Sequence, residues 1–137
     1  MARIELDSFV PHPPAAVWQA LTDPELLGRW LMPNDFEPTV GHRFTFTTDP
    51  APGFDGIVHC EVLDLVAEQR LAISWRGGAL DTRVSWTLHA EGAGTRLFLV
   101  HDGFDADDPA QASTMKILGG GWRGLLARRL EAVLDGS

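Results

Sequence analysis

Four short alternating segments, joined by turns of a few residues, constrain this chain more than any other feature. They are predicted at 57–66, 71–76, 82–90 and 95–101. Apolar residues recur at every second position, which is the period of a β-strand with one buried face. Such short connections join antiparallel neighbours, because a parallel crossover needs a much longer link. The predicted inward positions are Val58, Cys60, Val62, Leu71, Ile73, Trp75, Val84, Trp86, Leu88, Leu97, Leu99 and His101.

Three further elements are predicted before these strands. A strand at 3–10 ends at a proline-rich stretch, and Pro14 suits the first position of a short helix. Asp23 suits the N-cap of a second short helix, with Pro24 following it. Alternation returns at 43–48, which predicts another strand.

A long amphipathic helix is predicted to end the chain. Asp108 suits its N-cap, Pro109 its first position and Gln111 its third, which is a capping pattern. The helix is expected to reach about Leu134, which gives about 25 residues or ~37 Å. Its predicted apolar stripe comprises Met115, Leu118, Trp122, Leu125, Leu126, Arg129, Leu130 and Val133.

These elements predict one α+β domain over residues 1–137. We expect a curved six-stranded antiparallel sheet, with the first strand beside the last and two short helices after the first strand. The C-terminal helix is long enough to lie across the concave face. A curved sheet around one helix seldom closes perfectly, so an internal cavity is expected between them.

The chain resembles the START-like (SRPBCC) superfamily, and within it the branch named for the activator of heat-shock-protein ATPase homologues. The resemblance is carried by PHPPAAVWQALTDPELLGRWLMP, VGHRFTF, DGIVHCEVLDL, RLAISW, GTRLFLVHDGF and GGWRGLLARRLEAVL, in that order. It implies a helix-grip fold with a hydrophobic pocket for a small ligand. It implies no single reaction, because members include lipid carriers, polyketide cyclases, antibiotic-sequestering proteins and co-chaperone domains. Co-chaperone members usually carry a separate N-terminal domain, which is not expected here, so a chaperone partner is the less expected role.

The candidate ligand wall combines the inward strand positions with apolar residues of the helices. Trp75, Trp86 and Trp122 could stack on a flat ligand, although tryptophans at such positions also serve plain core packing. The full predicted wall is Trp30, Phe44, Phe46, Val58, Cys60, Trp75, Trp86, Leu97, Leu99, His101, Met115, Leu118, Gly119 and Trp122.

His101 is the polar member of this wall, in register with Leu97 and Leu99. One interpretation is a ring that orients a ligand. The other is a core histidine satisfied by a backbone group, or one that reaches water at the strand end. Partial desolvation disfavours the charged ring, so the pKa of His101 is predicted to lie below its unfolded value.

Gly119, Gly120 and Gly121 interrupt the long helix, although glycine costs helix stability. Close packing is one explanation, with the backbone pressed against Trp18 or Trp30. The other is a bend that lets the first half of the helix move and admit a ligand.

No other chemical motif is found. The histidines lack metal-ligand spacing, Cys60 is alone and suits a small core residue, and the aspartates between 102 and 108 lack the pattern of a calcium loop. Phosphate-cradle and serine-nucleophile motifs are missing. We therefore assign no catalytic residue, no metal and no cofactor.

Net charge and hydropathy limit the classes of binding partner that we expect. The net charge is −8, from 11 basic and 19 acidic residues, which opposes binding to nucleic acid or to an anionic membrane surface. No apolar run approaches the ~18 residues that span a bilayer. Together with one cysteine and no apolar leader, this predicts a cytoplasmic protein.

Three functions follow as hypotheses. The first is a soluble carrier or sequestering module for a small apolar or aromatic molecule. The second is a cyclase-type enzyme in the same cavity, with His101 as general base and a nearby carboxylate. Converging polar groups in a pocket would favour it, but no second catalytic group is identifiable, so the expectation leans away from an enzyme. The third is a chaperone-partner domain, which a filled, dry core with an exposed apolar patch would favour. A homodimer also stays open.

Overall fold

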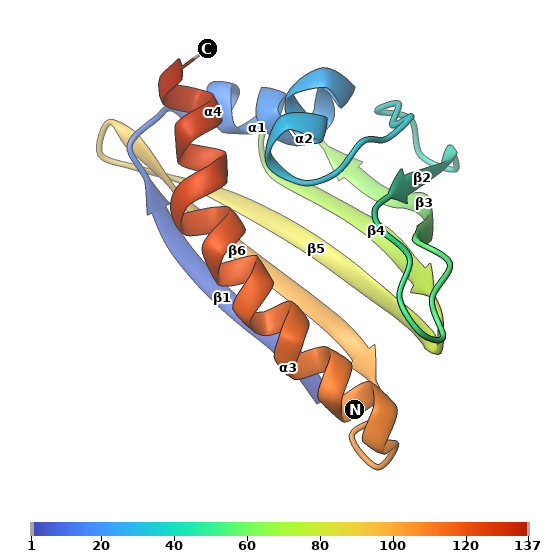
Figure 1. The fold of residues 1–137 in the computed structure, drawn as a ribbon. Helices are drawn as coiled ribbons and strands as arrows, with labels where there is room; N and C mark the ends of the chain where they lie inside the picture. The colour runs from blue at the N-terminus through green and yellow to red at the C-terminus, as the bar shows by residue number, and fades with distance from the viewer. Residues whose placement is uncertain (1, 137) are drawn as a thin grey trace.

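A six-stranded antiparallel sheet organises the molecule, seen in a computed structural model that describes residues 2–136 (Figure 1). The end residues of the predicted domain, Met1 and Ser137, lie outside the described residues. The strand order is β1-β6-β5-β4-β3-β2, so the first strand lies beside the last, as predicted. The strands are β1 (Ala2–Val10), β2 (Arg43–Thr47), β3 (Ile57–Val66), β4 (Arg70–Gly77), β5 (Leu80–Glu91) and β6 (Gly94–Phe104).

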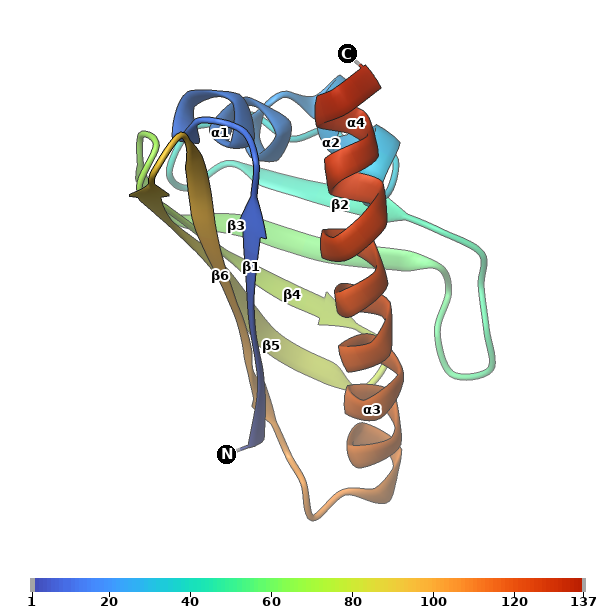
Figure 2. The ribbon, with the colours of Figure 1, turned by 90° about the vertical axis from the view of Figure 1, so that its left-hand side faces the viewer.

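The C-terminal helix crosses the concave face of the sheet as one continuous rod (Figures 1 and 2). It comprises α3 (Pro109–Gly124), a π-helical turn η1 (Leu125–Arg129) and α4 (Leu130–Gly136). Two short helices, α1 (Pro14–Thr22) and α2 (Pro24–Trp30), lie at the end of the sheet near the C-terminus (Figure 2). The predicted α+β helix-grip architecture is therefore confirmed.

Local sequence signals explain where the helices begin. Asp23 caps α2, because its carboxylate accepts hydrogen bonds from the backbone N–H groups of Glu25 and Leu26. Asp108 likewise accepts from the N–H of Ala110 at the start of α3. Gln111 does not complete the predicted capping box. Its Oε1 accepts from the N–H of Asp105, and its Nε2 donates to the carbonyl of Ala79 in the β4–β5 turn.

The predicted inward positions of the central strands are all buried. Trp75, Trp86 and Trp122 are exposed by only 4%, 1% and 2%, as predicted. One helical position was wrong, because Arg129 is exposed rather than part of the apolar stripe. The π-helical turn explains the difference: its wider turn changes the phase of the helix, so that Arg129 points outward, whereas Leu126 and Leu130 of the predicted stripe are buried.

One further property concerns the helices of residues 2–136. None of them combines the length and the hydropathy that crossing a membrane requires.

Candidate ligand-binding site

The centre of the concave face is an aromatic cluster around His101. The ring of Trp75, from β4, lies 5.5 Å from the rings of both His101 and Trp122. Trp122, from α3, also contacts Trp86 of β5 at 5.9 Å. Phe104 lies 4.7 Å from His101. The sheet therefore meets the helix through aromatic rings that surround one imidazole.

Both nitrogens of His101 are hydrogen bonded inside this cluster. The Trp122 indole N–H donates to Nδ1 at 3.1 Å, so Nδ1 carries no proton. Nε2 lies 2.8 Å from the hydroxyl of Thr82. That hydroxyl donates its own proton to the carbonyl of Trp75, so it accepts from an Nε2–H of His101. The ring is therefore held as the neutral Nε2–H tautomer.

This network has the features of the core interpretation of His101, and a ligand-orienting role stays a prediction. His101 is fully buried and satisfied, as in the core interpretation. Its direct partners, however, are the side chains of Thr82 and Trp122, where a backbone group or water was expected. Burial lowers the pKa of His101 from 6.5 to about 3, which confirms the predicted direction. A ring whose nitrogens are both engaged has no free lone pair for a substrate proton.

Cys60 behaves as the small core residue that was predicted. It is 5% exposed, on the inner face of β3. Burial, assisted by the negative charge of Asp35, raises the pKa of the Cys60 thiol to about 12. The nucleophilic thiolate is therefore scarce at neutral pH.

The predicted wall residues come together over the concave face, but to different degrees. Thr82 was missed, although it continues the inward alternation of β5 and so faces His101 across the β5–β6 hairpin. Met115, Leu118 and Gly119 are only partly buried. The buried members are Trp30, Phe44, Phe46, Val58, Cys60, Trp75, Trp86, Leu97, Leu99, His101 and Trp122.

The burial of side chains along the C-terminal helix changes at Trp122. Within α3, Trp122 is the buried residue, whereas none of residues 109–121 is buried. We call residues 109–121 the cover segment. A Cβ at Gly120 or Gly121 would meet nothing within 4 Å, and one at Gly119 would meet only Ile4, at 4.0 Å. Close packing against Trp18 or Trp30 therefore does not explain the glycines.

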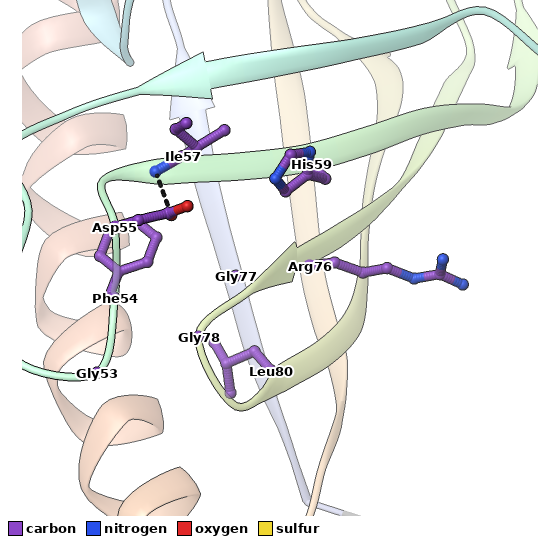
Figure 3. Close-up of a pocket in the computed structure, with 9 residues that line it drawn as sticks. All are labelled: Gly53, Phe54, Asp55, Ile57, His59, Arg76, Gly77, Gly78 and Leu80. Carbon is purple, nitrogen blue, oxygen red and sulfur yellow. Dashed lines mark hydrogen bonds between the residues drawn. The ribbon is translucent and has the colours of Figure 1, made fainter.

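Two surface hollows lie away from this cluster. The first, of about 560 Å³, lies at the end of β3 and β4, where Phe54 packs against Gly77 (Figure 3). The second, of about 510 Å³, lies on the convex face and shares His59 and Arg76 with the first. Trp86, Trp122 and His101 line neither hollow. The aromatic cluster and these hollows are thus separate places in the molecule.

Metal-binding potential can be assessed for residues 2–136. Within them, no three His, Cys, Asp or Glu side chains come together as a group that could hold a metal ion.

The sequence between residues 11 and 135 matches the family described as Activator of Hsp90 ATPase homolog 1-like protein. The chain belongs to this family. No curated protein matches the chain.

Several solved structures are similar to this family member over nearly its whole length. A protein from Mesorhizobium loti is 32% identical, with a TM-score of 0.88, over 99% of this chain and 98% of that one. CalU16 from Micromonospora echinospora is 25% identical, with a TM-score of 0.79, over 97% of this chain and 76% of that one. The Aha1 dimer from Colwellia psychrerythraea is 18% identical, with a TM-score of 0.81, over 100% and 99% of the two chains. The last of these likenesses concerns the fold alone.

Proposed function

We propose that this member of the Activator of Hsp90 ATPase homolog 1-like family is a carrier or sequestering module for a small apolar or aromatic molecule. The ligand would lie between the concave face of the sheet and the cover segment, against the aromatic cluster. The observation that carries this proposal is the contrast within one helix. The cover segment lies over an apolar face yet buries no residue of its own, whereas Trp122 beyond it is hydrogen bonded to His101.

Admission of the ligand would use the three glycines as a hinge. Glycine weakens a helix, and at Gly120 and Gly121 an added Cβ would meet nothing within 4 Å, so packing does not require glycine there. Bending at Gly119–Gly121 would lift the cover segment while Trp122 stays bound to His101. At its far end, the cover segment is tied to the sheet by the hydrogen bond from Gln111 to Ala79, which is exposed and therefore weak.

Binding is tested first with naphthalene as an uncharged flat probe. Calorimetry should show binding, and the melting temperature should rise with naphthalene concentration, because a ligand that binds only the folded state stabilises it. Trp86→Ala should weaken binding beyond its effect on stability. If a broad set of flat aromatic molecules gives neither heat nor a thermal shift, the proposed function fails.

The hinge is tested by replacing Gly119, Gly120 and Gly121 together with alanine. The variant should take up and release naphthalene more slowly, because a stiffer helix opens less often. Gly28→Ala is the matched control. It also improves a helix, but in α2, where a Cβ would make only ordinary contacts of 3.7 Å or more. Unchanged exchange in the triple variant would rule out the hinge.

The other hypotheses draw less support from this geometry. A cyclase with His101 as general base would need a free ring nitrogen, and both are engaged. A homodimer and a chaperone contact stay predictions; the neighbour from Colwellia psychrerythraea is described as a dimer.

A further inference from the structure

Trp86 carries a buried hydrogen-bond donor that the core does not use. Its side chain is 1% exposed, on the inner face of β5 between Leu71 of β4 and Leu99 of β6. Among the described residues, its indole Nε1 has no hydrogen-bond partner. Buried N–H groups are almost always paired, because an unpaired donor has lost water without replacing it.

Two other buried indoles show that this core can satisfy such groups. The N–H of Trp30 donates to the carbonyl of Ala20 at 2.9 Å. The N–H of Trp122 donates to His101 at 3.1 Å. Trp86 contacts the ring of Trp122 but obtains no acceptor from it, because the partner nitrogen is itself a donor. The unpaired donor therefore lies where the sheet meets the helix.

Neighbouring polar groups cannot supply the missing acceptor without breaking the network. Nδ1 of His101 already accepts from Trp122, and the Thr82 hydroxyl bridges His101 and the carbonyl of Trp75. The Trp86 donor is therefore free to meet an acceptor that a bound molecule brings.

The same surroundings constrain the charge of that molecule. Among the described residues, the buried polar side chains are Thr82, Thr95 and His101, and no cation is among them. Burial also keeps His101 neutral. A carboxylate or phosphate would thus be buried without a counter-charge, which is strongly unfavourable. A neutral carbonyl oxygen meets the donor without that cost.

We propose that Trp86 is the specificity-determining residue of this site, and that its Nε1–H selects an uncharged flat aromatic ligand bearing a carbonyl oxygen. This inference rests on the proposed function, because the ligand must enter between the sheet and the cover segment. Apolar rings would contact Trp75 and Trp122, while the single hydrogen bond to Trp86 would fix the orientation of the carbonyl.

The test compares 1-tetralone with tetralin, which share one ring skeleton and differ in the carbonyl. Calorimetry gives the ratio of their two affinities for the wild-type chain and for Trp86→Phe. Comparing ratios between proteins cancels the different hydration of the two probes. In Trp86→Phe the ratio should shift roughly five- to tenfold toward tetralin, which is the effect of one net hydrogen bond. The control, Trp18→Phe, removes an indole outside the candidate wall and should leave the ratio unchanged.

The outcomes separate this inference from the proposed function. If tetralin and 1-tetralone both bind, and Trp86→Phe leaves their ratio unchanged, Trp86 does not select the ligand but the binding function stands. If neither binds, both proposals fall.

A spectroscopic measurement covers the case in which Trp86→Phe does not fold. In wild-type protein labelled with ¹⁵N, the indole N–H resonance of Trp86 is assigned from through-space contacts with its cross-strand neighbours, Leu71 and Leu99. It should move downfield with 1-tetralone and not with tetralin. If the resonance responds equally to both probes, Trp86 does not select the carbonyl and the proposal is wrong.

Discussion

The two halves of the C-terminal helix differ in what holds them. Beyond the glycines, Trp122, Leu126 and Leu130 are exposed by 2%, 3% and 0%, and α4 packs against α1 and α2. In the cover segment no side chain is buried, and Ile117 is 72% exposed. The second half of this continuous helix thus completes the core, whereas the first half contacts the core only through partly buried side chains such as Met115 and Leu118.

The largest expected effect is on the second half. Trp122→Ala removes a buried ring and the donor to His101, and should lower the free energy of unfolding by about 3–5 kcal/mol. Met115→Ala, in the partly buried cover segment, should cost less than about 2 kcal/mol, since that is the lower end for a fully buried methionine. Urea denaturation of both variants measures the difference. Equal losses would show that the halves are equally part of the core.

The next effect concerns the imidazole that anchors the second half. With a folded pKa of about 3 against 6.5 unfolded, His101 stays neutral while the unfolded chain takes up a proton. Above about pH 6.5 His101 therefore adds no pH dependence to the free energy of unfolding. Below that pH it lowers the free energy of unfolding, and this loss grows as the pH falls toward the folded pKa.

This loss should amount to about 1.4 kcal/mol per pH unit, or roughly 2 kcal/mol between pH 6.5 and 5. Unfolding free energies of the wild type and of His101→Phe at pH 7 and pH 5 measure it. The variant should lack this component of the pH dependence. If both proteins lose the same stability, His101 is not the group that titrates.

Local features of this fold were predictable from the sequence, whereas contacts that depend on the position of the C-terminal helix were not. Alternation located the strands and their inward faces, and Asp23 and Asp108 identified two helix starts, because these signals are local. The partners of His101 are not local: they come from β5 and from α3. Strand alternation alone could place Thr82 on the same face as His101, but only the position of the helix brings Trp122 to Nδ1. The π-helical turn has no recognisable pattern in the sequence, so the exposure of Arg129 was missed.

The glycine triplet gives an effect of similar size and opposite sign. Since a Cβ at Gly120 or Gly121 meets nothing within 4 Å, the triple alanine variant should gain stability, by about 1.5–3 kcal/mol from improved helix propensity. Thermal unfolding measures the gain. Gly94→Ala is the contrasting control and should be destabilised, because its Cβ would lie 2.5 Å from the carbonyl oxygen of Val10. A destabilised triple variant would restore the packing explanation.

The smallest expected effect on global stability is at the far end of the cover segment. Gln111 joins the segment to the sheet by donating to Ala79 O at 3.3 Å, and joins it to the preceding loop by accepting from Asp105 N at 2.9 Å. Both bonds are exposed, so Gln111→Ala should cost less than about 1 kcal/mol in unfolding free energy. Local opening should respond more strongly, because residues 112–121 have no buried side chain to hold them down. Hydrogen exchange should therefore accelerate at the amides of 113–121 and stay unchanged at 126–134. Equal acceleration in both ranges would mean that the helix opens as one unit, and that the division at Trp122 is structural but not dynamic.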